Sequence, residues 1–289
     1  MRPAALLAAA GIALAIGHAL AEPISVRDDS GERVLLQAPA RRVITLAPSL
    51  TELMFAVGAG ARLVGVDSAS DYPSEARALP RIGDAAGIDL ERVIWLRPDL
   101  VLRWSSGNKP ADLERLRKLS IPVFSSEPCM LDDVPRNLRM LGALVDSQPV
   151  AHAQALAFER RLAEIRVRYA HQRTLSVFVA IWHQPLMTVN GAHLVSDVLR
   201  TCNARNVFAD LQALAGPVSL ERLLVANPDA IVNATGSDED LAGSQRLRSL
   251  YALQAGSVLR VDPDELTRAT PRILDATEQV CAWLERLRG

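Results

Sequence analysis

Aromatic, imidazole and charged side chains stand at several places where alternating strands and helices would present them to a ligand. Each follows the end of an expected strand or flanks an expected strand–helix junction, which is where open α/β sheets bind ligands. Only 4% of the residues are aromatic, so rings at strand ends are informative. Such rings could line a ligand-binding cleft between two facing lobes. The candidate ligand-binding residues are Tyr72, Trp104, Trp182, His183, Asp264 and Arg268.

Two simpler interpretations of these residues stay open. Each ring could cap the core of its own folding unit, because Tyr and Trp are usually part-buried. Arg268 could pair with Asp264 on the surface instead of binding an acidic or amide-bearing ligand near the start of the final helix. The other two tryptophans, Trp95 and Trp283, fall inside amphipathic helices, and we assign both to the core.

Motifs for catalysis or for metal binding are mostly missing. The sequence has no G-x-S-x-G nucleophile elbow and no G-K-[ST] phosphate loop. The histidines after residue 21 do not show the H-x-x-x-H spacing of a metal site, and the carboxylates are scattered. We therefore predict no catalytic residue, no metal site and no covalent cofactor. An exported α/β hydrolase that uses scattered carboxylates stays open as an alternative.

The elements that must position the candidate residues form a regular alternation of strands and helices. Strands separated by helical stretches predict parallel, doubly wound sheets, and a hairpin at residues 24–26 and 34–36 precedes them. The expected strands are 43–46, 63–66, 100–104, 123–125, 175–181, 186–189, 230–233 and 258–261. The expected helices are 49–57, 89–96, 109–119, 131–145, 194–201, 219–226, 245–251 and 271–287.

One long helix is expected between the two halves of the chain, over residues 147–172. Its apolar positions recur at spacings of 4, 3, 4, 3 and 4, which draws a single stripe along one helical face. The stripe consists of Ala151, Ala155, Phe158, Leu162, Ile165 and Tyr169. One continuous helix between two lobes predicts that they close on a ligand by a few degrees rather than by tens of degrees.

An internal repeat indicates that the two halves fold alike. Residues 90–94 (LERVI) and 98–102 (PDLVL) recur as 220–224 (LERLL) and 228–232 (PDAIV). Each copy predicts a short helix, a turn at Pro-Asp and a buried strand. We predict an α/β fold of two doubly wound lobes, residues 22–146 and 173–289, joined by the helix at 147–172.

The N-terminus has the features of a secretory signal peptide over residues 1–21. A basic start is followed by a short apolar stretch and by Ala19-Leu20-Ala21, an A-x-A cleavage site. Beyond it no apolar run reaches about 18 residues, so we predict that the mature chain is not embedded in a membrane. Its 31 basic and 33 acidic side chains give a net charge of −2, which offers no surface for nucleic acid. Cys129, Cys202 and Cys281 leave three possible pairings in an oxidising compartment.

Several motifs resemble those of the helical-backbone periplasmic binding proteins, which supply ABC importers with vitamin B12, haem and iron–siderophore complexes. They are RVITLAPSLTEL at 42–53, VGV at 64–66 and SDYP at 70–73. The members of this family that bind vitamin B12 are also similar at 90–92, 98–101, 104–108, 206–208 and 268–272, so the resemblance covers nearly all of the mature chain.

The resemblance implies a periplasmic monomer that captures a corrinoid, vitamin B12 or a relative, between its lobes. It would deliver this ligand to an inner-membrane ABC permease with its ATPase; haem or an iron–siderophore is the alternative ligand within the family. The resemblance also implies roles for particular residues. Tyr72 and Trp104 would pack on the corrinoid, Asp264 and Arg268 would bond its periphery, Glu91 and Glu221 would dock on the permease, and Cys202 would pair with Cys281.

The sequence departs from the family at two positions of the expected cleft. Ala85 and Ala215 stand where the vitamin B12-binding members have tryptophan. Trp182 and His183 could compensate, because the family has no Trp-His pair at that place. An axial bond from His183 to cobalt or haem iron is the less favoured alternative.

Overall fold

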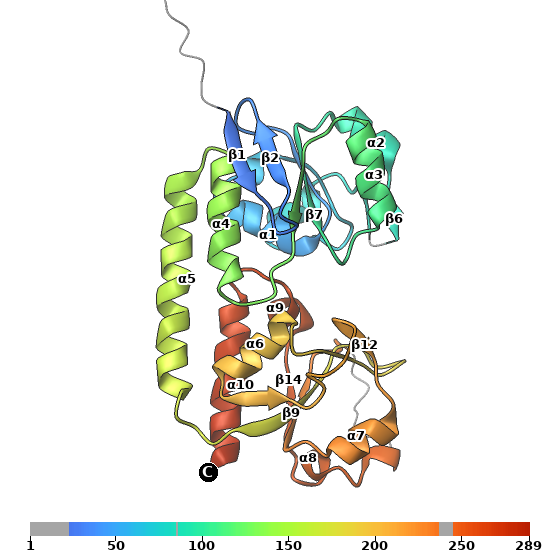
Figure 1. The fold of residues 1–289 in the computed structure, drawn as a ribbon, viewed down its shortest axis with the longest axis vertical. Helices are drawn as coiled ribbons and strands as arrows, with labels where there is room; N and C mark the ends of the chain where they lie inside the picture. Colours follow the sequence, from blue (N-terminus) through green and yellow to red (C-terminus); the bar gives the residue numbers. More distant parts are fainter. Residues whose placement is uncertain (1–22, 85, 237–244) are drawn as a thin grey trace, which may run out of the picture.

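The fold is described from a computed structural model over residues 23–84, 86–236 and 245–289. The chain forms two α/β lobes along the long axis of the molecule, and helix α5 (Gln148–Tyr169) runs beside both of them (Figure 1). The expected signal peptide and Ala85 lie outside the described residues. In the part of the chain that is described, no helix is both long and apolar enough to cross a membrane.

The N-terminal lobe is built on a four-stranded parallel sheet with the order β4-β3-β7-β8. Its strands are β3 (Val43–Thr45), β4 (Leu63–Val66), β7 (Leu100–Trp104) and β8 (Val123–Ser126). Its helices are α1 (Pro48–Ala56), α2 (Leu90–Leu96), α3 (Pro110–Lys118) and α4 (Asp133–Leu144). The predicted hairpin is confirmed as β1 (Ile24–Arg27) and β2 (Arg33–Leu36), and a short pair, β5 (Gly83–Asp84) and β6 (Gly87–Ile88), lies outside the main sheet.

The C-terminal lobe repeats this arrangement, with a parallel sheet in the order β11-β9-β13-β14. In both lobes the first strand along the chain lies between the second and the third. The strands of this lobe are β9 (Leu175–Ala180), β11 (Ala204–Asn206), β13 (Ala230–Asn233) and β14 (Val258–Arg260). Its helices are α6 (Leu194–Thr201), α7 (Leu220–Ala226), α8 (Tyr251–Gln254), α9 (Pro263–Thr267) and α10 (Ile273–Arg288).

The internal repeat in the sequence is therefore a repeat in the structure. Helices α2 and α7 each end at a left-handed residue, Arg97 (φ 46°) and Asn227 (φ 37°). The Asp of each Pro-Asp turn then binds the backbone next to or within the first strand of its own sheet. Asp99 accepts hydrogen bonds from the backbone N–H groups of residues 41 and 42, and Asp229 accepts one from that of residue 176. The predicted two-lobe α/β fold is confirmed.

Several elements of the C-terminal lobe differ from the prediction. Strand β10 (Met187–Val189) pairs antiparallel with β12 (Ala215–Pro217), outside the main sheet. Strand β11 was not expected, because it is three residues long and two of them, Arg205 and Asn206, are polar. The helix expected at 245–251 is instead a 3-10 helix at Gln245–Leu247 followed by α8. Short segments like these hold too few residues to show an apolar period.

Helix α5 buries the predicted apolar stripe, and its flanks are tied to the neighbouring helices by ion pairs. All six stripe residues are buried, and α5 packs against α4, α10 and α6. Arg161 pairs with Glu278 of α10 at 2.7 Å, and Glu159 pairs with Arg139 of α4 at 2.7 Å. Because α4 belongs to one lobe and α10 to the other, α5 is the common support that sets their separation.

The structure confirms the predicted disulfide and corrects one assignment. Cys202, which follows α6, is bonded to Cys281 of α10, and Cys129 is a free thiol. Trp283 is buried as predicted, but assigning Trp95 to the core was wrong, because its side chain is 76% exposed. Helix α2 has only two turns and buries Val93 and Leu96, so the ring on its other face lies in solvent.

Candidate ligand-binding site

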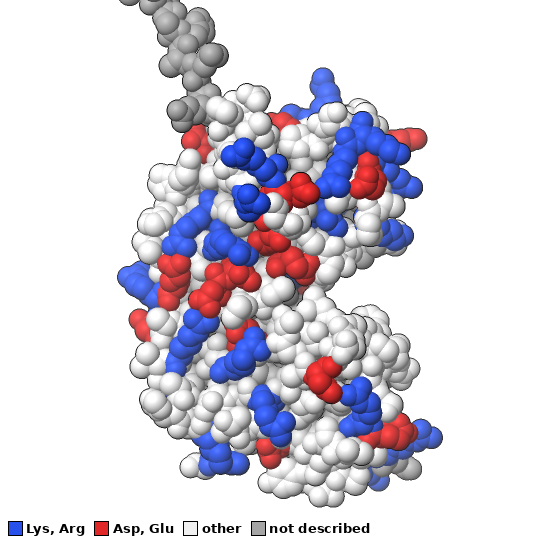
Figure 2. All heavy atoms as spheres, in the orientation of Figure 1, with Lys and Arg blue, Asp and Glu red and all other residues white. Residues whose placement is uncertain are grey.

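A cavity of about 600 Å³ lies between the lobes, where the molecular surface is hollowed in Figure 2. Residues that end or follow strands of both sheets reach it, among them Trp104 at the end of β7 and Ile181 directly after β9. The N-terminal lobe contributes Ala47, Pro48, Ser49, Leu50, Ala69, Trp104, Ser106, Ser126, Glu127, Pro128 and Cys129. The C-terminal lobe contributes Ile181, His193, Leu194, Leu214, Ala215, Ala234, Pro263, Asp264, Thr267, Arg268 and Ala269.

Trp104 is fixed at the cavity by the loop that follows it. Its backbone N–H donates to Asn108 Oδ1 at 2.7 Å, and its indole Nε1 donates to Glu127 Oε1 at 3.3 Å. The same carboxylate accepts from the backbone N–H of Ser106 at 2.6 Å. Gly107 is required here, because a Cβ at this position would lie 1.9 Å from the indole ring. The half-exposed ring is thus held in place before any ligand arrives.

Arg268 lies in the cavity wall, but other side chains already occupy its guanidinium group. Nη1 donates to Glu52 Oε1 and to Asp71 Oδ1, both at 2.8 Å, and Nη2 pairs with Asp264 Oδ2 at 2.8 Å. Arg272 also donates to Glu52, at 2.8 and 3.0 Å. The pairing of Arg268 with Asp264 is therefore confirmed, within a larger cluster that joins α1 to the segment between α9 and α10.

The two acids beside Arg268 differ in how readily they ionise. Burial raises the pKa of Asp264 above its ordinary value, although the charge of Arg268 opposes the rise. Burial also acts to raise the pKa of Asp71, but the hydrogen bond from Arg268 and its positive charge outweigh this and lower that pKa. Asp264 is therefore the more easily protonated of the two, and when protonated it can donate as well as accept a hydrogen bond.

The remaining predicted ligand-binding residues do not line this cavity. The ring of Tyr72 lies beneath the guanidinium group of Arg272, 3.8 Å from it, and next to Asp71 of the cluster. Trp182 and His183 lie in the turn between β9 and β10, where the indole Nε1 of Trp182 donates to the carbonyl of Gln184 at 3.1 Å. Of the six predicted residues, the cavity brings together Trp104, Asp264 and Arg268.

Three important side chains of the site are missing from the sequence-based prediction: Glu52, Glu127 and His193. Glu52 does have a signal, because it is the one charged residue in its helix, and a buried carboxylate requires a cationic partner. His193 comes directly before the amphipathic helix α6, at the position of a helix cap. Glu127 follows β8 and has no distinguishing pattern. Among the described residues, no group of three or more His, Cys, Asp or Glu is placed to hold a metal ion.

Residues 43–265 match the family model described as periplasmic binding protein. The chain belongs to this family. The Vitamin B12-binding protein of Vibrio cholerae serotype O1 is 35% identical over 251 residues, which cover 86% of this chain and 90% of that protein. The protein of the same name from Yersinia pseudotuberculosis is 37% identical over 86% of this chain and 88% of its own length.

Solved structures agree with this assignment of the fold. The crystal structure of the periplasmic vitamin B12 binding protein of Vibrio cholerae has a TM-score of 0.80, 35% identity, and coverage of 86% of this chain and 98% of that one. A periplasmic haem-binding protein from Pseudomonas aeruginosa has a TM-score of 0.70, 26% identity, and coverage of 84% and 92%. The proteins that this periplasmic binding protein resembles are thus named for binding, not for catalysis.

Glu91 and Glu221, the two acids of the repeat, occupy equivalent places on the outer surface of this periplasmic binding protein. Each is exposed in the first turn of its helix, α2 or α7. The pKa of Glu221 is lowered by hydrogen bonds that its carboxylate accepts from the backbone N–H of Glu221 itself and from the side chain of Ser219. This acid is therefore ionised at neutral pH. One turn later in each helix stands an exposed apolar side chain, Trp95 or Val225, the latter 87% exposed.

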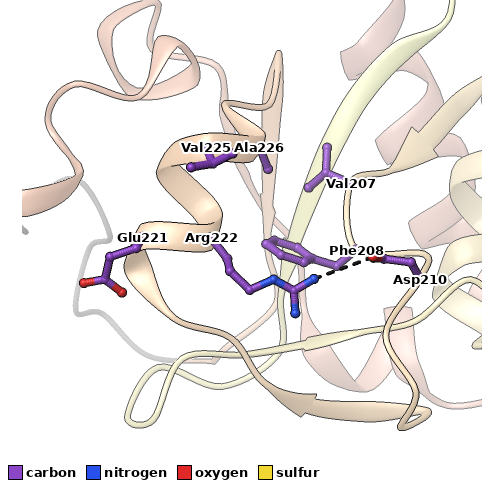
Figure 3. Close-up of a pocket in the computed structure, with 7 residues that line it drawn as sticks. All are labelled: Val207, Phe208, Asp210, Glu221, Arg222, Val225 and Ala226. Atoms are coloured by element: carbon purple, nitrogen blue, oxygen red, sulfur yellow. Dashed lines mark ion pairs between the residues drawn. The ribbon is translucent and has the colours of Figure 1, made fainter.

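A hollow of about 350 Å³ lies beside Glu221 (Figure 3). The guanidinium group of Arg222 stands 5.4 Å from the centre of the Phe208 ring and pairs with Asp210 at 3.6 Å, whereas Glu221 points away from both. Arg222 therefore contacts side chains of its own lobe, whereas the carboxylate of Glu221 is exposed to solvent.

Proposed function

We propose that this chain is the substrate-binding protein of an ABC importer and that it captures a corrinoid, vitamin B12 or a relative, between its two lobes. The observation that carries the proposal is the cavity between the lobes, which is lined by a pre-positioned Trp104 and by aliphatic side chains of both lobes. Relatives that are at least 35% identical over most of their length and are named for vitamin B12 support the choice of ligand. Burial of a macrocycle against such walls needs no bond to be made or broken.

The remaining parts of this proposal concern location and assembly. Residues 1–21 would be cleaved as a signal peptide, and the mature monomer would work in the periplasm without turning over its ligand. Residues 22–146 and 173–289 would act as the two ligand-holding units, with 147–172 as the connection between them. The family of periplasmic binding proteins, to which residues 43–265 belong, supports this location.

Ligand titration tests the proposal directly. The mature protein is titrated with cyanocobalamin, cobinamide and haemin, and tryptophan quenching and ligand absorbance are followed. We expect saturable binding of the corrinoids, weakened about tenfold or more by Trp104→Ala because a ring of the cavity wall is lost. Trp95→Ala removes a more exposed tryptophan ring outside the cavity and is the control. If neither corrinoid gives a saturable response, the proposal is wrong, and tight binding of haemin alone would favour the haem alternative.

We also propose that Glu91 and Glu221 dock on basic residues of the inner-membrane permease, one acid from each lobe. Their equivalent positions and exposure support this, as do the exposed Trp95 and Val225 one turn away. The double variant Glu91→Ala/Glu221→Ala should weaken association with the permease in lipid nanodiscs and leave corrinoid affinity unchanged. Glu285→Ala, an exposed acid on α10, is the control. Undiminished association of the double variant would remove these acids from the docking surface.

A further inference from the structure

His193 is a polar side chain in the C-terminal lobe's part of the cavity lining, to which Asp264, Thr267 and Arg268 also belong. The described residues between 181 and 234 that line the cavity are Ile181, His193, Leu194, Leu214, Ala215 and Ala234. Within this stretch the imidazole is the one polar side chain, and its neighbours in the lining are aliphatic. One polar group in such surroundings has a large effect on orientation, because a hydrogen bond left unmade there is costly.

The orientation of the imidazole is fixed by helix α6. His193 is the N-cap residue of this helix, and its Nδ1 accepts a hydrogen bond from the backbone N–H of Val195 at 3.1 Å. Its backbone carbonyl accepts from the N–H of Ser196 at 2.8 Å, and its backbone N–H donates to the carbonyl of Asn190. These contacts occupy Nδ1 and leave Nε2 with no hydrogen-bond partner among the described residues.

The same contacts decide which ring nitrogen carries the proton. Burial lowers the pKa of His193 to about 4, so the imidazole is neutral at pH 7 and has one N–H. Because Nδ1 accepts a hydrogen bond, the proton is on Nε2. The cavity wall therefore offers a hydrogen-bond donor, and the nitrogen that carries it has no lone pair free to bind a metal.

We propose that His193 determines specificity by donating its Nε2–H to an amide carbonyl oxygen on the rim of the macrocycle, and that it does not bind the central metal. This inference rests on the proposed corrinoid-binding function, because corrinoids carry amide groups around the ring. For Nε2 to bind a metal, the proton would have to move to Nδ1, where it would face the N–H of Val195 and break the helix cap. The site would thus select a macrocycle by its rim and reject one with no acceptor at this point.

Variants of His193 separate donation from capping. His193→Ser keeps an oxygen that can accept from the N–H of Val195 and removes the donor toward the cavity. His193→Asn keeps the cap and retains an N–H donor on a shorter side chain. We expect His193→Ser to weaken cyanocobalamin binding about three- to tenfold, the range for one neutral hydrogen bond, and His193→Asn to lie between it and the wild type. The absorbance spectrum of bound cobinamide should be the same in all three proteins.

Two results would overturn the inference. One is equal cyanocobalamin affinity in the wild type and His193→Ser, with circular dichroism showing that both are folded. The other is an axial-ligand band of bound cobinamide or haemin that disappears in His193→Ser. Nitrogen-15 NMR of the ligand-free protein tests the donor separately, because it reports which ring nitrogen is protonated. A proton on Nδ1 would refute the inference, whereas a wild type that binds no corrinoid but carries the proton on Nε2 would refute only the proposed function.

Discussion

Replacing Glu52 by Gln should destabilise the protein by about 3 kcal/mol, because this carboxylate joins the two lobes behind the ligand cavity. Glu52 is 4% exposed in α1 and accepts hydrogen bonds from Arg268 and Arg272, which lie 216 and 220 residues further along the chain. Gln has nearly the same volume, so the substitution removes the charge and puts an amide N–H₂ group close to two guanidinium groups.

The magnitude follows from the partners that each arginine retains. Removing one member of a buried ion pair costs about 3–5 kcal/mol when nothing compensates. Arg268 keeps Asp71 and Asp264, each at 2.8 Å, and Arg272 keeps Glu265 at 3.5 Å. We therefore expect the low end of that range for the free energy of unfolding.

Urea unfolding, followed by far-ultraviolet circular dichroism and by tryptophan fluorescence, measures the change. The matched control is Glu159→Gln, which breaks the ion pair with Arg139 on the surface between α5 and α4. That pair is more than one-third exposed, so its loss should cost less than about 1 kcal/mol. If Glu52→Gln costs no more than Glu159→Gln, the bonds between α1 and the two arginines do not hold the lobes together.

Three further predictions follow from single contacts. Gly107→Ala should displace the Trp104 ring and weaken ligand binding about tenfold in fluorescence titrations, because the new Cβ overlaps that ring; unchanged affinity would mean that the ring moves at no cost. Replacing Cys202 and Cys281 together by Ala should lower the free energy of urea unfolding by about 4 kcal/mol, since the bridge closes a loop with a sequence separation of 79. His193 takes up a proton below about pH 6.5 in the unfolded chain, but only near pH 4 in the folded protein. The free energy of unfolding should therefore decrease as the pH is lowered from 6.5 to 4. This loss should reach at most about 3 kcal/mol and be missing from His193→Ser; an equal loss in that variant would assign it to other groups.

Much of the architecture could be predicted from the sequence because it follows from local periodic patterns. The stripe from Ala151 to Tyr169 identifies α5 and its buried face, since spacings of three and four residues bring side chains to one side of a helix. The two Pro-Asp turns indicate two similar lobes because each copy of the repeat carries its own helix end, turn and strand. The pairing of Cys202 with Cys281 came from family resemblance, because spacing alone allowed three pairings.

The site was predictable only in part. Trp104 stands at the end of a buried strand, and Asp264 and Arg268 stand at a strand–helix junction, so their proximity to the cavity follows from the topology of the sheet. The same logic places Trp182 and His183 at a strand end, yet the turn into β10 keeps them out of the cavity wall. The direction of a side chain in a loop depends on the conformation of that turn, which no period in the sequence records.

What the amino-acid sequence determines by itself is which faces of each helix and strand are buried, because that follows from residues a few positions apart. The tertiary structure alone decides which groups meet across the lobes. It joins the guanidinium group of Arg268 to Glu52, Asp71 and Asp264 in the cavity wall. It also partly buries His193 at the cavity and fixes its Nδ1 on a helix N–H. Burial and partners set the charge and the hydrogen-bonding role of a side chain, and at this site both arise only in the folded protein.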